Sequence, residues 1–258
     1  MHGTSKRIAA LAVPSNLMLA SCIMRGWVQT FVVLLALLAS DIALAKKPKL
    51  LVYVPTSITV REFQSRLQGQ LPAVEIRAYG RIKDFERAIK SEQPDGLLSF
   101  PAVLETQSLA SKVQGNRKGS SNDSYVLVTL EKAASTDSLD GSIIGVLDLL
   151  GRKRMPGLVT AITGIPGKPK LKRVKRLEDL VSLLLLGMAD SILVPARAVD
   201  EMKKSSGANL VTTPVKGGLA LPSLGVINQD SSQAMADALT KLDSKTNLEM
   251  GVDKWLQL

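Results

Sequence analysis

Short apolar runs alternate with amphipathic stretches along this chain. Residues 49–54 form a nearly continuous apolar run with β-branched and aromatic members, which predicts a strand buried on both faces. Over residues 59–71 apolar side chains recur every four positions, which predicts an amphipathic helix that Pro72 ends. The alternation continues with a strand, a helix and a strand over residues 74–79, 82–89 and 97–100. This regular alternation predicts parallel βαβ units.

A second series of elements follows a polar segment. Pro101 opens a helical stretch to about residue 112, and residues 114–123 are rich in Gly, Asn and Ser, as is typical of a turn or linker. The helix expected over residues 177–187 is so rich in Leu that it should be buried nearly all round. Further strands are expected over residues 125–130, 142–147, 191–194, 210–215 and 219–227, and further helices around residues 158–162, 195–202 and 234–242.

One segment of this second series is strongly basic. Residues 168–176 carry six Lys or Arg side chains among nine positions. We expect a weak edge strand here, whose charges discourage self-association. The alternative is contact with anionic lipid or with an acidic membrane partner.

The first 45 residues have the parts of a secretory leader. With a start at Met24, a positively charged residue precedes the apolar run 31–39, and residues 43–45 give a small-x-small cleavage pattern. The apolar run is too short to span a bilayer comfortably. We therefore predict cleavage after Ala45 and export to the periplasm. A lipoprotein anchor at Cys22 is the alternative.

The composition removes several classes of chemistry. The chain has 258 residues with one His and one Cys, which are His2 and Cys22, both inside the predicted leader. The exported part would hold neither, which excludes a Ser-His-Asp or Cys-His nucleophile, a Cys/His zinc site, an iron–sulfur cluster and a disulfide framework. No Walker-type, Gly-x-Ser-x-Gly, Ser-x-x-Lys or dinucleotide glycine pattern is present. We predict no catalytic residue, no metal and no cofactor.

The charge balance indicates an anionic partner. Without the leader, 30 basic and 22 acidic side chains remain, a net charge of +8 over residues 46–258. A basic exported protein suits an anionic ligand or an anionic envelope surface. Nucleic acid is the competing partner, but export argues against it, and no aromatic residue falls inside a basic run to stack on bases. We expect no nucleic-acid partner and a monomer.

Three segments together resemble a known family. They are Pro55-Thr56-Ser57 after the first strand, the segment 139–146 (Leu-Asp-Gly-Ser-Ile-Ile-Gly-Val), and the segment 187–195 (Gly-Met-Ala-Asp-Ser-Ile-Leu-Val-Pro). With the leader, they look like a type 2 periplasmic solute-binding protein, most similar to the phosphate/phosphonate branch of ABC transporter receptors. The resemblance implies an α/β, two-lobed periplasmic-binding-protein-like (type 2) fold with mostly parallel sheets and an interlobe cleft. We assign residues 46–120 plus 220–258 to lobe 1 and residues 121–219 to lobe 2.

Candidate ligand-binding residues follow from this arrangement. In open α/β sheets ligands bind beyond the carboxyl ends of strands, where helix N-termini suit phosphate or carboxylate. Thr56 and Ser57 hold that place after the first strand and Ser99 after the third. The alternatives are helix capping for Thr56 and Ser57, and a buried, backbone-bonded hydroxyl for Ser99.

Two further candidates lie in the second series. Phosphonate receptors carry a Ser/Thr-Ser-Gly run at the loop equivalent to residues 148–154, where this chain departs from the pattern with a Leu-Leu-Gly-Arg-Lys-Arg run. Arg152 could replace the missing hydroxyls with a bidentate guanidinium, or the run could be a solvated basic turn. Asp190 either faces the cleft or caps the start of its strand.

The sequence therefore predicts an exported, non-catalytic solute-binding protein of the phosphate/phosphonate transporter type, with a small anionic ligand and an ABC permease or membrane sensor as partner. The alternative is a periplasmic sensor-input or envelope adaptor domain with the same fold that has lost transport.

Overall fold

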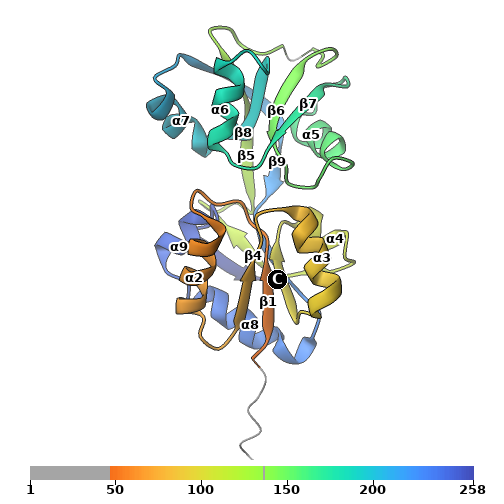
Figure 1. Cartoon of the computed structure of the whole chain (residues 1–258), viewed down its shortest axis with the longest axis vertical. Helices are drawn as coiled ribbons and strands as arrows, with labels where there is room; N and C mark the ends of the chain where they lie inside the picture. The colour runs from red at the N-terminus through yellow and green to blue at the C-terminus, as the bar shows by residue number, and fades with distance from the viewer. Residues whose placement is uncertain (1–46, 136) are drawn as a thin grey trace, which may run out of the picture. The chain divides into compact units, whose positions relative to one another are not determined.

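The computed structural model describes residues 47–135 and 137–258, so the predicted leader and its cleavage site lie outside the described residues. The described part contains two β-sheets, each flanked by helices, which form the two lobes seen in Figure 1. Among the described residues, no helix is long and apolar enough to span a membrane.

The sheet of lobe 1 has six strands in the order β11-β4-β10-β3-β1-β2. Strands β1, β2, β3 and β4 run in one direction, while β10 and β11 run in the other. The bounds are β1 Lys49–Val52, β2 Glu75–Ala78, β3 Gly96–Ser99, β4 Ser111–Asn116, β10 Ser223–Val226 and β11 Lys254–Gln257.

Helices cover both faces of this sheet. Alternate residues of β1 point to opposite faces, so Leu50 and Val52 pack with α2 and α8, whereas Leu51 and Tyr53 pack with α3 and α4. Phe85 of α3 is fully buried and stacks on Tyr53 with ring centroids 5.5 Å apart. The bounds are α2 Val60–Gln70, α3 Ile82–Glu92, α4 Pro101–Glu105, α8 Ser232–Thr240 and α9 Ser244–Glu249, with the 3-10 turn η2 over Gln229–Ser231.

The sheet of lobe 2 has five strands in the order β7-β6-β8-β5-β9, and only β5 runs against the others. Helix α5 packs on one face and helices α6 and α7 pack on the other. The bounds are β5 Asn122–Leu130, β6 Ile143–Leu147, α5 Met155–Thr163, β7 Lys170–Val174, α6 Glu178–Leu185, β8 Ser191–Pro195, η1 Ala196–Ala198, α7 Val199–Ser206 and β9 Leu210–Ala220. The basic segment forms β7, which lies at the edge of the sheet as predicted.

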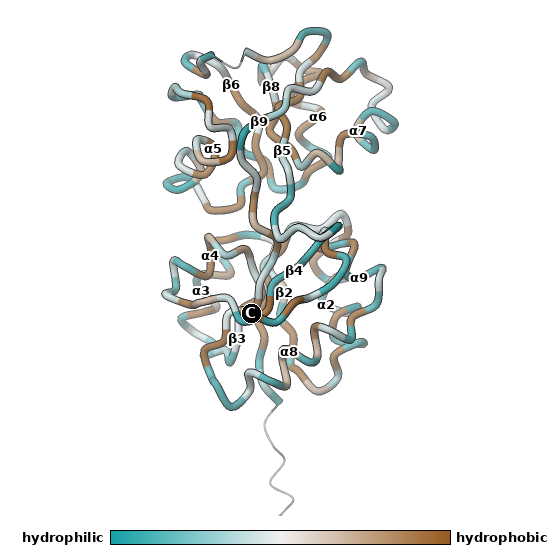
Figure 2. Tube along the Cα trace, turned by 180° about the vertical axis from the view of Figure 1, so that it is seen from behind, coloured by the Kyte–Doolittle hydropathy of each residue, from teal (hydrophilic) through white to brown (hydrophobic). Residues whose placement is uncertain are grey.

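The chain crosses between the lobes twice, through adjacent segments. Strands β5 and β9 pair from Asn122↔Ala220 to Leu130↔Leu210, and Figure 2 shows them side by side between the lobes. A Cβ atom at Gly218 would lie 2.5 Å from the carbonyl oxygen of Asp123, so only glycine allows the two backbones to approach so closely at this bulge. The paired strands connect the lobes as a hinge.

Several predicted elements differ in the structure. The helix after Pro101 ends at Glu105, because Ser108 turns with a φ of 57° and residues 111–116 pair with β10 and β11 instead. The predicted linker 114–123 therefore holds the end of β4 and the start of β5.

The second half contains further differences. Two strands were predicted over residues 210–215 and 219–227, and both are present with other bounds, because β9 extends to Ala220 and β10 covers Ser223–Val226. The Leu-rich helix α6 stops at Leu185, and Leu185 and Leu186 are 51% and 72% exposed, so the expectation of burial all round was wrong at this end. Helix α9 and strand β11 were not predicted; Trp255 anchors β11 by donating a hydrogen bond to Asn247 at 2.9 Å.

Candidate ligand-binding cleft

A cleft of about 780 Å³ lies between the two lobes. Residues that follow the carboxyl ends of parallel strands from both sheets line it: Thr56 and Ser57 after β1, Phe100 after β3, Lys175 after β7 and Arg197 after β8. Helix α9 of lobe 1 and helices α6 and α7 of lobe 2 form its remaining walls. This is the place where α/β sheets bind ligands, because the loops there can vary without disturbing the strands.

Charged side chains of both signs line the cleft in equal number. The basic ones are Lys175, Arg176, Arg197 and Lys245, and the acidic ones are Asp123, Glu178, Glu201 and Glu249. Within the described part of the chain, Lys175, Lys245, Glu178 and Glu201 form no ion pair. These four side chains are available to a charged ligand.

Arg197 is the most firmly positioned cation of the cleft. Its Nε donates a hydrogen bond to Asp123 Oδ2 at 2.7 Å, which fixes the guanidinium beside the hinge strand β5. The same guanidinium lies against Gly251 of lobe 1, where an added Cβ atom would come within 2.8 Å of Nη2. Arg197 therefore reaches from lobe 2 to lobe 1 across the cleft, and a planar guanidinium held in this way suits a carboxylate or phosphate group.

A second polar network lies on the wall formed by lobe 1. The Ser57 hydroxyl donates a hydrogen bond to Glu249 Oε2 at 2.6 Å, and Arg66 Nη1 lies 3.6 Å from Glu249 Oε1. Asp243 begins α9 by accepting a hydrogen bond from the backbone N–H of Thr246 at 2.7 Å, an interaction that lowers the pKa of the Asp243 carboxyl. The cap and the network hold α9 and its lining residues against the cleft.

Apolar side chains complete the lining. They include Val54, Phe100, Leu177, Val181, Met202 and Leu219. Burial raises the pKa of the Tyr125 phenol, which also lines the cleft, and the nearby Asp123 raises it further. Tyr125 is therefore a neutral group at physiological pH.

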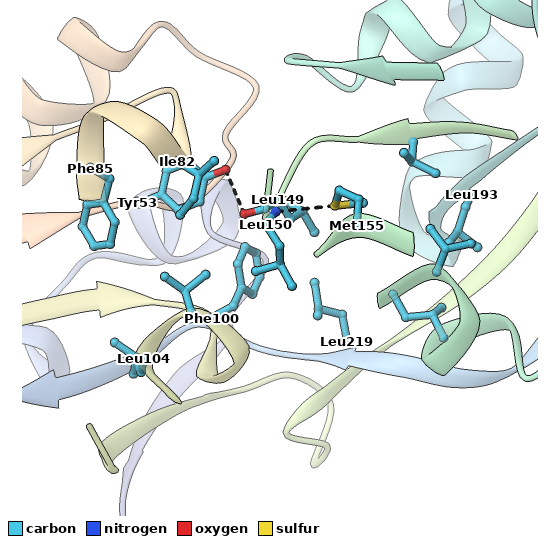
Figure 3. Close-up of a cluster of buried hydrophobic side chains, with 14 of the residues drawn as sticks. Tyr53, Ile82, Phe85, Phe100, Leu104, Leu149, Leu150, Met155, Leu193 and Leu219 are labelled. Carbon is cyan, nitrogen blue, oxygen red and sulfur yellow. Dashed lines mark hydrogen bonds between the residues drawn. The ribbon is translucent and has the colours of Figure 1, made fainter. Parts of the chain in front are cut away.

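The loop 148–154 of lobe 2 lies between the lobes, at the edge of the cleft. Leu149 and Leu150 of this loop are 4% and 8% exposed and belong to one continuous apolar core cluster with residues of both lobes. Figure 3 shows Leu149 and Leu150 between Tyr53 and Phe100 on one side and Met155 on the other. Leu149 also lines the cleft, so the loop forms an apolar boundary of the cleft.

Polar contacts fix the same loop to lobe 1. The buried Tyr53 hydroxyl donates to the carbonyl oxygens of Asp148 at 3.0 Å and Leu149 at 3.2 Å. Arg154 pairs with Glu86 of α3 and donates from Nε to the Leu150 carbonyl oxygen at 3.1 Å. Burial raises the pKa of the Tyr53 phenol, and the negative charges of Asp148 and Glu86 raise it further, so the phenol stays a donor.

The structure brings two of the five predicted site residues to the cleft. Thr56 and Ser57 line it, and neither caps the next helix, because Thr59 accepts the hydrogen bond from the Glu62 N–H instead. Thr56 Oγ1 donates to the Ile58 carbonyl oxygen at 3.0 Å.

The other three residues lie elsewhere. Ser99 is fully buried and donates to the Tyr53 carbonyl oxygen at 2.9 Å, which matches the alternative of a backbone-bonded hydroxyl. Asp190 precedes β8, at the end of that strand opposite to the cleft, and accepts a hydrogen bond from the Ile143 N–H at 2.7 Å. Arg152 is exposed and is absent from the cleft lining.

Two cationic residues that line the cleft, Arg197 and Lys245, were not selected from the sequence. Arg197 comes two residues after Pro195, which follows the predicted strand 191–194, so the rule that selected Ser57 and Ser99 also selects Arg197. Lys245 carried no such signal, because its helix α9 was not predicted. Over residues 47–135 and 137–258, no three His, Cys, Asp or Glu side chains are grouped as metal ligands.

This chain is similar to known proteins by structure and not by sequence. No protein-family model matches this chain, and no curated protein matches it by sequence. XAC2383 from Xanthomonas citri bound to ATP is similar with a TM-score of 0.62 at 10% identity, over 81% of this chain and 91% of that chain. The arginine-bound form of truncated ArgBP from T. maritima is similar with a TM-score of 0.50 at 15% identity, over 76% and 96%.

A third solved structure is also similar. The BvgS VFT2 domain of Bordetella pertussis, as a double mutant, has a TM-score of 0.50 at 12% identity, over 79% of this chain and 91% of that chain. This chain has the two-lobed fold of the type 2 periplasmic binding proteins. At these identities the likeness shows the fold alone, and none of these structures supports the predicted phosphate/phosphonate branch.

Proposed function

We propose that this protein is an exported, non-catalytic solute-binding protein that holds a small organic anion in the interlobe cleft. The observation that carries the proposal is the position of Arg197, which Asp123 and Gly251 hold across a cleft between the carboxyl ends of strands from both lobes. Lys175 and Lys245, together with the hydroxyls of Thr56 and Ser57, would supply the remaining contacts to an anionic group.

The cleft favours an organic ligand over free phosphate. Its volume of about 780 Å³ lies in the range typical of pockets for drug-sized molecules. Its apolar lining suits a hydrocarbon part, and the unpaired carboxylates of Glu178 and Glu201 suit a cationic group on the same molecule. The hydroxyl-rich loop of phosphonate receptors is replaced here by Leu149 and Leu150, which are buried. We therefore expect carboxylates that carry an apolar part or an amino group to bind more tightly than phosphate and phosphonates.

Titration calorimetry with purified protein tests the proposal. The panel contains amino acids, dicarboxylates, nucleotides, phosphate, phosphonates and sulfate, with neutral sugars and amines as controls. We expect saturable binding of at least one organic anion. Binding of neutral or purely cationic solutes alone contradicts the proposal.

A matched pair of variants locates the binding site. Arg197→Lys keeps the charge but removes the planar fork, and it should weaken anion binding by about tenfold, which is the worth of one charge-assisted hydrogen bond. Arg176→Lys is the control, because Arg176 also lines the cleft but pairs with Asp179 at 2.7 Å. Equal effects at both positions would remove Arg197 from the site.

Two classes of membrane partner suit a protein with this fold. A solute-binding protein in the periplasm delivers its ligand to an ABC permease, whereas a sensor-input domain presents it to a membrane sensor. Gene neighbourhood separates the two: an adjacent permease and ATPase supports transport, and an adjacent sensor kinase supports signalling.

A further inference from the structure

We propose that the loop 148–154 is a latch that holds the two lobes together in the absence of ligand. Leu149 and Leu150 of this loop join the apolar cluster that spans both lobes, and Leu149 also forms part of the cleft lining. The lobes would therefore be closed on the latch side before any solute arrives.

The apolar part of the latch is the contact of Leu149 and Leu150 with lobe 1. Both side chains are nearly excluded from water and belong to the same buried cluster as Ile82, Phe85 and Phe100 of lobe 1. Separation of the lobes would expose these surfaces, and the hydrophobic effect opposes this. Figure 3 shows the two leucines between Tyr53 and Phe100 of lobe 1 and Met155 of lobe 2.

Hydrogen bonds and an ion pair form the polar part of the latch. Tyr53 donates to two carbonyl oxygens of the loop, and Arg154 connects Glu86 in lobe 1 with the loop backbone at Leu150. Within lobe 2 the loop is braced by Asp148, which pairs with Arg173 at 2.6 Å and accepts from the Gly151 N–H at 3.0 Å. The latch is thus rigid on its own lobe and bonded to the other, so it acts as a fixed contact and not as a flexible loop.

The part of the cleft around Arg197 has a more polar lining than the latch. There the lobes meet through the Arg197 guanidinium against Gly251, and charged, unpaired side chains line the remaining space. Opening of the lobes would begin at this polar side and would be complete only when the latch breaks. The latch would keep the binding residues close to their bound positions and raise the apparent affinity, since affinity falls with the fraction of molecules in the competent state. This effect on affinity rests on the proposed function; the closed ligand-free state does not.

Small-angle X-ray scattering of the ligand-free full chain tests the latch. Leu150→Asp places a charge in the apolar contact, and we expect a larger radius of gyration than in the unmodified protein. Leu186→Asp is the matched control, because Leu186 is 72% exposed on lobe 2 and its substitution should leave the scattering unchanged. Identical scattering of the Leu150→Asp variant and the unmodified protein, with native circular dichroism, overturns the proposal.

A milder variant covers the case in which Leu150→Asp does not fold. Arg154→Gln removes the ion pair to Glu86 but keeps the loop sequence otherwise intact, and hydrogen exchange at the Leu150 and Gly151 amides reports the loop. We expect faster exchange at these amides, with unchanged exchange in β1 and β8. Unchanged exchange at the latch overturns the proposal as well.

Ligand titration separates this proposal from the proposed function. If an organic anion binds, the latch variants should bind it about tenfold more weakly, while the Leu186→Asp control binds normally. If no solute in the panel binds, the proposed function fails, and the scattering result alone still decides the latch.

Discussion

Two parts of the interlobe space differ in chemistry, although segments that follow strand ends form both. In one part, the loop after β6 brings Leu149 and Leu150 into the apolar cluster that contains Phe100, and Leu149 and Phe100 also form the apolar boundary of the cleft. In the other part, the segments after β1, β7 and β8 bring hydroxyls and charges to the wall of a cleft. The difference shows that a carboxyl-end loop can serve either as a contact between lobes or as part of a binding site, depending on whether its side chains can be removed from water.

The largest loss of stability should come from substitution of Phe100, which packs with the latch and also borders the cleft. It is 9% exposed within the apolar cluster that joins the lobes. Phe100→Ala should lower the free energy of unfolding by about 3–5 kcal/mol, because a buried aromatic ring is lost and a cavity remains. Urea unfolding measures this, and Leu186→Ala on the exposed end of α6 should change stability by less than about 0.5 kcal/mol. Equal losses for both variants would contradict the burial of Phe100.

The second effect concerns the Arg197 contact on the cleft side. Gly251 has a φ of 74°, so Gly251→Ala should cost about 1–2 kcal/mol through backbone strain alone. The added methyl group would also displace the Arg197 guanidinium. Gly207→Ala is the matched control, since Gly207 has a φ of 63° and no atom near an added Cβ. We expect weaker ligand binding for the Gly251 variant only. Equal binding by both variants would argue against a contact between Arg197 and the ligand.

Removal of the Tyr53 hydroxyl should have a smaller effect on the free energy of unfolding. Tyr53→Phe leaves two carbonyl oxygens of the latch without their donor and should cost about 0.5–1.5 kcal/mol. Tyr79→Phe is the comparison, because the Tyr79 hydroxyl bonds Glu92 within lobe 1. In chemical denaturation both variants should lose stability, but only the Tyr53 variant should expand the ligand-free protein in scattering. Expansion of both would mean that the hydroxyl contact does not act between the lobes.

Alkaline pH acts on the same two phenols. Burial and, next in size, the hydrogen bond to Glu92 together raise the pKa of Tyr79 to about 12, and burial also raises the pKa of Tyr53. A raised folded-state pKa means that this stability is present below the unfolded value of about 10 and is lost as pH rises above it. The midpoint of urea unfolding should therefore fall from about pH 10 upward, and less steeply in a protein that carries both Tyr→Phe substitutions. An unchanged slope would show that other groups dominate.

The smallest effect is expected at Arg152. This side chain is exposed, so Arg152→Lys should change stability by less than about 0.5 kcal/mol and leave ligand binding unchanged. Arg154→Lys, on the same loop, should loosen the bond to Glu86 and to the Leu150 carbonyl and therefore cost more. Weaker ligand binding by the Arg152 variant would return this residue to the site.

Local pattern was sufficient for the elements that position the cleft. The apolar run at 49–54, the four-residue spacing from Phe63 to Leu71 and the buried strand before Pro195 all appear where the sequence predicts them. Their burial is decided within a few neighbouring residues, so periodicity is enough. Helix α9 and strand β11 carry no such pattern, because Trp255 and Asn247 stabilise them through a single side-chain hydrogen bond and through packing on distant elements.

The order of residues was enough to predict the alternation of strands and helices, the edge position of the basic strand and the place of Thr56 and Ser57 after the first strand. It could not predict that Leu149 and Leu150 turn toward the other lobe, while Arg152 stays exposed and Arg197 faces the cleft, because these positions depend on contacts between distant segments. The physical reason is that a loop has no periodicity to assign its faces. Which of its side chains leave water depends on the surface that the other lobe presents, and that surface is built from residues about 50 to 100 positions away in the chain.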